Sequence, residues 1–125
     1  MILVDTSVWI DHLRDGNPAL VALLLDSQVL AHPWVTGEIA LGNLANRGEV
    51  LGLLGNLSQA AVATDTELRT LIDRHRLFGC GIGYVDVQLL AATMLTSGSA
   101  LWSRDKRLAA IAADLGIAHE QPPAP

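Results

Sequence analysis

The N-terminal stretch constrains the fold most, because a short apolar run ends at an acid and a helical pattern starts directly after it. Residues 2–4 are Ile, Leu and Val, a composition that indicates a buried strand. Asp5 follows this run, and the hydroxyl of Thr6 or Ser7 could cap the next helix. Functional residues of open α/β sheets lie beyond the carboxyl ends of the strands, so Asp5 is a candidate site residue. The alternative is that Asp5 is itself only an N-cap, which is common for Asp.

The rest of the chain alternates between strand and helix patterns. Segment 84–97 is apolar almost all round, which is typical of a buried helix. This alternation predicts an α/β fold with a mainly parallel sheet that is covered on both faces. Further strands are expected at 28–32, 60–63, 99–103 and 116–119, and further helices at 19–25, 34–46, 49–57, from Thr64 onward and at 105–115.

The length of 125 residues suits one compact domain and is too small for two. We expect a single domain over 1–120 and a frayed tail over 121–125. No apolar run reaches the roughly 18 residues that a membrane span needs, and the N-terminus lacks a leader-like pattern. The expectation is therefore a cytoplasmic protein with no membrane partner. Cys80 is the single cysteine, so neither an intrachain disulfide nor a zinc framework is expected.

The formal charge of −5 argues weakly against a protein that binds nucleic acid through its overall charge, because such domains are usually basic. It allows an enzyme with an acidic, metal-filled site and a local basic patch. Most of the acids fit solvated helix faces, caps or tails, since charged residues are rarely buried.

Four acids stand where a solvated side chain is not expected. Asp5 and Asp105 follow predicted strands, Glu38 interrupts an otherwise apolar helix, and Asp86 lies near the start of the most buried helix. A buried carboxylate must be paired or must bind a metal, and basic residues near these positions in sequence are scarce. A cluster of carboxylate oxygens suits Mg²⁺ or Mn²⁺. For each acid alone the alternative stays open: Asp86 could cap its helix, and Glu38 could simply be exposed.

Segments 3–11, 36–42, 83–92 and 101–108 together resemble the four acidic motifs of the PIN domain, and more narrowly the VapC ribonuclease toxins of bacterial toxin–antitoxin pairs. The resemblance covers nearly the whole chain. It implies a three-layer α/β/α sandwich, Mg²⁺-dependent RNA cleavage, homodimerisation and inhibition by a VapB-type antitoxin. Ser103 departs mildly from the family pattern, which often has Thr there.

By position, the resemblance carries the family's metal-binding role over to Asp5, Glu38, Asp86 and Asp105. Asp5 would be the central or bridging ligand, Asp86 and Asp105 would complete the metal shell, and Glu38 would bind directly or through water. Hydrolysis of a phosphodiester needs an activated water and charge stabilisation at the phosphate, and a carboxylate-held metal supplies both. Thr6 and Ser103 would hold these ligands in place, although both also fit ordinary cap and strand-end positions.

The second basic cluster along the chain adjoins Asp105. Arg104, Lys106 and Arg107 could contact the RNA backbone, or they could be a solvated helix start. The other cluster, 74–76, and the glycine-rich loop 79–83 carry no clear motif. Two sets of residues are interpreted as structural: His12, His32 and His119 as structural or exposed, and Trp9, Trp34 and Trp102 as core or interface rather than base-stacking positions.

Two rival functions remain open on the sequence. One is a PIN nuclease that acts in RNA processing and is not a toxin. The other is a catalytically inactive α/β module that binds RNA or protein, against which the presence of all four acids argues.

Overall fold

A four-stranded parallel sheet forms the centre of the fold. The computed structural model describes residues 1–120, and the expected tail at 121–125 lies outside the described residues. The strand order is β3-β2-β1-β4, and every pairing is parallel. The strands are β1 (Ile2–Val4), β2 (Val29–Ala31), β3 (Ser58–Gln59) and β4 (Ala100–Trp102). All four carboxyl ends therefore meet along one edge of the sheet.

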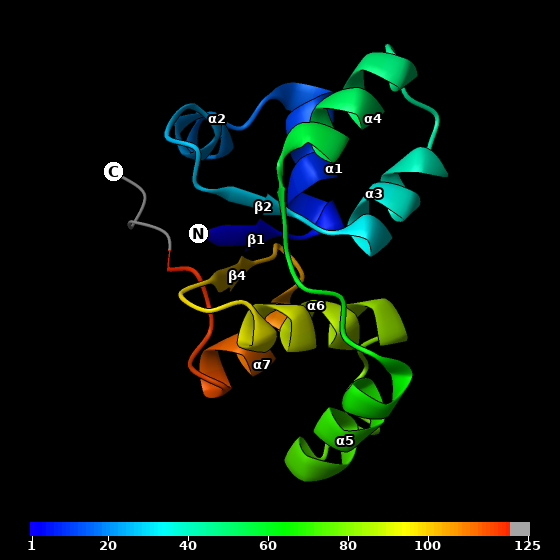
Figure 1. The fold of residues 1–125 in the computed structure, drawn as a ribbon, viewed down its shortest axis with the longest axis vertical. Coiled ribbons are helices and arrows are strands. Elements are labelled where there is room, and N and C mark those ends of the chain that lie inside the picture. Colours follow the sequence, from blue (N-terminus) through cyan, green and yellow to red (C-terminus); the bar gives the residue numbers. More distant parts are fainter. Residues whose placement is uncertain (121–125) are drawn as a thin grey trace.

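Helices cover both faces of this sheet, which confirms the predicted α/β/α sandwich. Figure 1 shows α1 to α4 on one side and α6 and α7 on the other, with α5 packed on the outside of α6. None of the helices in the described part is both long and apolar enough to cross a membrane. Their bounds are Thr6–Asp15 (α1), Pro18–Leu25 (α2), Pro33–Ala40 (α3), Arg47–Asn56 (α4), Asp65–His75 (α5), Tyr84–Leu95 (α6) and Lys106–Asp114 (α7).

Helix α6 is the most buried element, as its apolar sequence predicts. Seven consecutive residues, from Val87 to Thr93, are buried. They pack with Leu3 and Val4 of β1 and with Leu101 of β4 in the main core. This core fixes the first turn of α6 beside the carboxyl edge of the sheet.

The third strand was predicted two residues too late, at 60–63. The ladder ends with the bond from the Ala60 amide to the Ala31 carbonyl, at 2.8 Å. Beyond Ala60, the side chains of Gln88 in α6 and of Thr96, the residue after α6, bond to the backbone groups. The Ala61 amide donates to Thr96 Oγ1, and the amide and carbonyl of Ala63 bond to Gln88. These partners come from another element, so no local pattern showed where the strand stops.

Three other boundaries differ from the predictions. Helix α3 ends at Ala40 rather than near Asn46, because the chain turns at Gly42, whose amide bonds to the Ile39 carbonyl. The expected last strand at 116–119 is an isolated bridge between Ala118 and Leu101. The cap of α1 is Asp5, whose carboxylate accepts from the Thr6 amide, and not the hydroxyl of Thr6 or Ser7.

Candidate active site

Asp5 is a buried carboxylate at the end of the central strand β1. It is 6% exposed and accepts three hydrogen bonds. The Thr6 amide donates to Oδ1 at 2.7 Å, and the hydroxyls of Ser7 and Ser103 donate to Oδ2 at 2.8 and 2.7 Å. A carboxylate has about four lone-pair sites, so one remains. The predicted alternative for Asp5, an N-cap, and its candidacy as a site residue are therefore compatible.

Two serine hydroxyls connect the ends of β1 and β4. Ser103 Oγ donates to Asp5 and accepts from the Asp105 amide at 3.0 Å. Ser7 Oγ also donates to Asp5 and accepts from the Arg104 amide at 3.0 Å. The backbone joins the same two ends, since the Asp5 amide donates to the Trp102 carbonyl at 2.9 Å. Asp5 and Asp105 are thus held next to each other by their own surroundings.

The other strand-end acid, Asp105, caps helix α7. Its Oδ1 accepts from the amides of Arg107 and Leu108 at 2.9 and 3.1 Å, and the residue is exposed. This capping uses two of its roughly four lone-pair sites. The carboxylate can therefore accept further ligands without leaving the cap.

Glu38 reaches the site from α3 through Thr6. Thr6 Oγ1 donates to Glu38 Oε1 at 2.7 Å, and Thr6 follows Asp5 directly. The Glu38 residue is exposed, as one of the two predicted alternatives had it. Its position nevertheless places a third carboxylate at the edge that Asp5 and Asp105 share.

Asp86 completes the group and carries its clearest electrostatic signature. Burial raises the pKa of the Asp86 carboxyl, the bond from the Gly83 amide at 3.0 Å opposes this, and the charges of Asp5, Asp105 and Glu38 raise the pKa further. The bond to Gly83 is the predicted helix cap. Within residues 1–120, none of the four acids has an ion-pair partner. Four acids that are distant in sequence therefore share one edge, and no ion pair among the described residues neutralises any of them.

The donor set of these four residues fits a hard divalent cation. All donors are carboxylate oxygens, and each acid keeps lone-pair sites that the protein bonds do not use. In the described part, no three His, Cys, Asp or Glu side chains form a ready-made metal site. Asp86 and Asp105 accept hydrogen bonds at their helix starts, and Glu38 accepts one from Thr6. A bound cation would relieve the repulsion that raises the pKa of Asp86.

Known proteins of similar sequence identify the family of this chain. No family model matches the chain. The chain is 51% identical over 118 residues to the protein named Ribonuclease VapC32 in two strains of Mycobacterium tuberculosis, CDC 1551 / Oshkosh and H37Rv. The match covers 94% of this chain and 95% of each relative. This chain belongs to the VapC family of PIN-domain ribonucleases.

Membership of the VapC family agrees with the predicted fold. It does not test the role of any single residue. The metal-binding roles of Asp5, Glu38, Asp86 and Asp105 stay predictions, as do the supporting roles of Thr6 and Ser103, although both hydroxyls contact these acids.

The basic residues beside Asp105 are partly engaged with the protein. Arg104 Nη1 lies 2.6 Å from Asp11 Oδ1, and Arg107 Nη1 lies 3.5 Å from the carbonyl of Gly81. Lys106 is exposed at the start of α7. All three lie next to the acids, and their predicted contact with RNA remains open.

The sequence interpretation gave no site role to two residues that contact the candidate site. Ser7 was considered only as a helix cap, yet its hydroxyl bridges Asp5 and the Arg104 amide. Asp11 was among the acids interpreted as solvated faces, caps or tails, yet its carboxylate pairs with Arg104. The available signal was their spacing on α1, because Ser7 and Asp11 are four residues apart and share the face that meets the β4–α7 loop.

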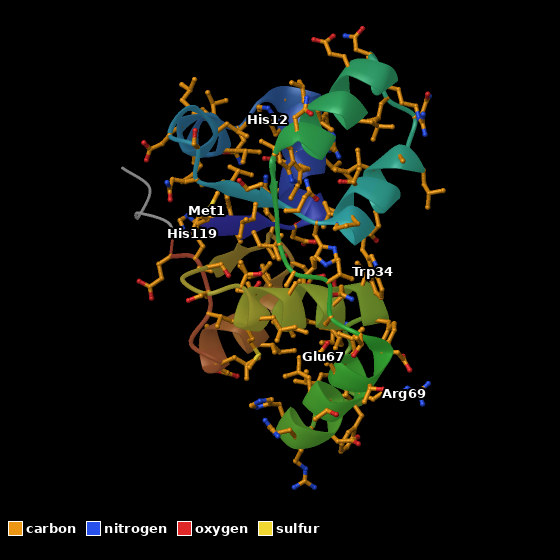
Figure 2. The ribbon with its side chains drawn as sticks, viewed as in Figure 1. Met1, His12, Trp34, Glu67, Arg69 and His119 are labelled. Carbon is orange, nitrogen blue, oxygen red and sulfur yellow. The ribbon has the colours of Figure 1, made fainter. Side chains whose placement is uncertain are left out.

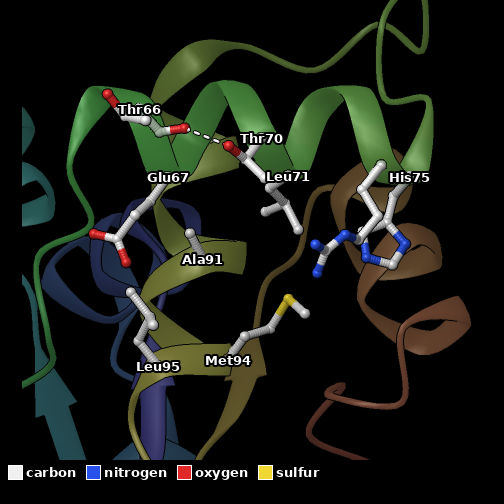
Figure 3. Close-up of a pocket in the computed structure, with 9 residues that line it drawn as sticks. Thr66, Glu67, Thr70, Leu71, His75, Ala91, Met94 and Leu95 are labelled. Carbon is white, nitrogen blue, oxygen red and sulfur yellow. Dashed lines mark hydrogen bonds between the residues drawn. The ribbon is translucent and has the colours of Figure 1, made fainter.

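A separate hollow of about 260 Å³ lies between α5 and α6. Figure 3 shows Leu71, Ala91, Met94 and Leu95 around it, with His75 at one end. Its residues on α6 begin five positions after Asp86, about 8 Å farther along the helix axis. The hollow is therefore distinct from the acidic site.

Proposed function

We propose that this VapC chain is a Mg²⁺-dependent endoribonuclease that hydrolyses RNA phosphodiester bonds, with Mn²⁺ as a possible substitute. The observation that carries the proposal is the group of four acids at one sheet edge, where burial raises the pKa of Asp86 and the charges of the three other acids raise it further. The printed name of the M. tuberculosis relatives, a ribonuclease, supports the same reaction.

In this proposal Asp5, Asp86 and Asp105 hold the cation, and Glu38 contributes directly or through water. The bound ion would supply charge stabilisation at the attacked phosphate and a lowered pKa for a bound water. Ser7 and Ser103 keep the Asp5 carboxylate in one orientation through their bonds to Oδ2, and Thr6 orients Glu38. Such supporting hydrogen bonds commonly change metal affinity or activity by 10- to 100-fold.

Cleavage of a structured RNA tests this function directly. The native chain should cleave in Mg²⁺ and not in EDTA, and Asp86→Asn should lose most cleavage in Mg²⁺. Asp73→Asn is the matched control, because Asp73 is an exposed acid on α5 outside the site. Full cleavage by the native chain in excess EDTA would contradict the proposal.

We further propose that Arg104, Lys106 and Arg107 contact the RNA backbone. On an Asp5→Asn background, which prevents cleavage, Arg104→Ala with Arg107→Ala should flatten the salt dependence of RNA binding by about one unit of slope per lost contact. Arg14→Ala, at the far end of α1, is the control. An unchanged slope in the double variant would show that the patch is only solvated.

A cytoplasmic toxin role, a homodimer and inhibition by a VapB-type antitoxin complete the proposal. Induction of the chain in a bacterial host should arrest growth, and co-expression of the product of a small neighbouring gene should restore it. Growth arrest should be absent in Asp86→Asn. Normal growth of the host that carries the native, active chain would favour a role in RNA processing instead.

A further inference from the structure

Two aromatic rings stand side by side at the carboxyl edge of the sheet. Trp34 lies in the first turn of α3 and Tyr84 begins α6, and their ring centroids are 6.0 Å apart at an interplanar angle of 43°. Figure 2 shows Trp34 where the helices of the two layers meet. Tyr84 is 43% exposed and Trp34 is partly exposed, whereas Trp9 and Trp102 are each 5% exposed. Trp34 therefore differs from the two tryptophans of the core.

Each ring is held in place by a contact with a neighbouring side chain. The Tyr84 hydroxyl donates to Asp65 Oδ1 at the start of α5, and Asp65 also pairs with Arg69 at 3.0 Å. Trp34 meets the edge of the fully buried His32, with ring centroids 6.3 Å apart and an interplanar angle of 88°. Rings that are already ordered lose little conformational freedom when a ligand binds them.

The pair lies beside the acids. Strand β2, which leads into Trp34, is the neighbour of β1, which ends at Asp5, and neighbouring strands are about 4.8 Å apart. Trp34 precedes Glu38 by four residues, so the two share a face of α3. Tyr84 precedes Asp86 by two residues in the first turn of α6. A nucleotide whose base lay on these rings would keep a neighbouring phosphate close to the acids.

The net negative charge of the chain makes an uncharged contact with RNA useful. The chain has 8 basic and 13 acidic residues, so general attraction for phosphates is weak, and the four acids repel them locally. Stacking of a base on an aromatic ring needs no charge and tolerates any base. It requires a base that is free of its pairing partner.

We propose that Trp34 and Tyr84 form a stacking surface for an unpaired RNA base next to the acidic site. The inference rests on the proposed nuclease function and adds specificity to it. It also revises the interpretation of Trp34 as a core or interface residue. Arg69, at 3.0 Å from Asp65, lies on the Tyr84 side of this surface.

Binding of a short oligouridine to an Asp86→Asn background measures the inference without cleavage. The oligouridine should bind about tenfold more tightly than the same strand with abasic sites, and more tightly than its duplex with a complementary strand. Quenching of tryptophan fluorescence should accompany binding, and Trp34→Leu should remove it because Trp9 and Trp102 are buried.

Matched variants separate stacking from structure. Trp34→Leu with Tyr84→Leu should weaken oligouridine binding by tenfold or more and should abolish the difference between normal and abasic strands. Tyr84→Phe keeps the ring and loses only the bond to Asp65, so its binding should stay within about twofold of the background protein. Equal binding of normal and abasic strands by the background protein would overturn the inference.

Sedimentation of the same variants tests a protein partner instead. If Trp34→Leu changed the oligomeric state and left RNA affinity per chain unchanged, the pair would be a contact between copies and the inference would be wrong. The nuclease function and the stacking surface can be contradicted independently of each other. Metal-dependent cleavage with no base dependence of binding would remove only the stacking surface, and base-dependent binding with no cleavage would remove only the nuclease.

Discussion

At two neighbouring strand-to-helix junctions, a buried polar side chain caps the helix, but only one of these side chains is free to bind a further ligand. After β1, Asp5 is 6% exposed and caps α1 through the Thr6 amide. After β2, His32 is fully buried and caps α3 through the Trp34 amide, which donates to Nδ1 at 3.0 Å. Each junction places a buried polar side chain at the carboxyl edge of the sheet.

The difference lies in what remains unsatisfied. The Nε2 of His32 faces Gln88 Oε1 at 3.2 Å, and Gln88 also bonds to the amide and carbonyl of Ala63, at 2.8 and 3.0 Å. This network has no spare polar atom and no charge, so we interpret it as structural. Asp5 has no cation partner among the described residues, keeps an unused lone-pair site and lies in a group with three further acids. A polar residue at a strand end thus indicates a site only where charge and lone pairs are left over.

The largest expected effect is a loss of stability when the hydrogen bonds around His32 are removed. Gln88→Met keeps the volume and removes the hydrogen bonds, which leaves the amide and carbonyl of Ala63 and one nitrogen of His32 unpaired. At about 1–3 kcal/mol for each buried unsatisfied group, the free energy of unfolding should fall by about 4 kcal/mol, a drop in Tm of roughly 15 °C. Urea unfolding measures it. Thr93→Val, which removes another buried hydroxyl of α6, is the control and should cost much less.

The second prediction concerns the junction at Asp5, where a substitution should affect cleavage more than stability. Asp5→Asn should lower RNA cleavage by at least about 100-fold, since even supporting residues of metal sites cost 10- to 100-fold. Its stability should fall less than that of Gln88→Met, because Asn caps helices about as well as Asp and only the bonds from the Ser7 and Ser103 hydroxyls to Oδ2 are lost. Cleavage rates and thermal melts of the same preparation measure both quantities. Nearly native cleavage by Asp5→Asn, or a melting temperature as low as that of Gln88→Met, would erase the distinction between the junctions.

A smaller expected effect is the pH dependence of stability that His32 causes at its junction. Burial lowers the pKa of His32 below its usual value of about 6.5, and the bonds with Gln88 and with the Ala61 backbone oppose this. The unfolded chain then binds more protons than the folded chain just below pH 6.5. The stability that the neutral ring contributes is therefore complete above pH 6.5 and is lost as the pH falls toward the folded pKa, by up to about 1.4 kcal/mol per pH unit.

His32→Asn provides the reference for this measurement, because Asn can cap α3 and does not titrate. Urea unfolding between pH 7 and pH 5 should show a steeper loss of stability in the native chain than in the variant. The difference between the two slopes isolates His32 from His119, whose pKa burial also lowers. Parallel slopes would mean that His32 is not held in its neutral form.

Features that arise from local patterns could be predicted from the sequence, and this includes most of the candidate site. The strand at 2–4 and the acids at its end and at the end of the strand near 100 follow from short runs of residues, and the order of the four acids gave the family. Capping by Asp5 and Asp86 was weighed as an alternative to a site, and both residues turned out to cap a helix while lying in the acidic group.

Features that depend on contacts between distant elements could not be predicted. The end of β3 is set by Gln88 of α6 and by Thr96, which follows α6. The bridging role of Ser7 depends on the Arg104 amide, which is 97 residues away. The pairing of Trp34 with Tyr84 has the same origin. In each case the residue type fitted an ordinary structural role in its own segment, and its contact partner came from a segment far away in the sequence.

Thermal melting with and without metal tests the central claim, that the four acids form one cation site. A ligand that binds only the folded state stabilises it by about 2.7 kcal/mol at 100 times its dissociation constant. Mg²⁺ or Mn²⁺ should therefore raise the melting temperature of the native chain, and should raise that of Asp86→Asn much less. In EDTA, Asp86→Asn should melt higher than the native chain, because one of four mutually repelling charges is gone. A native melting temperature that is indifferent to millimolar Mg²⁺ and Mn²⁺, at matched ionic strength, would contradict the cation site and the nuclease function proposed from it.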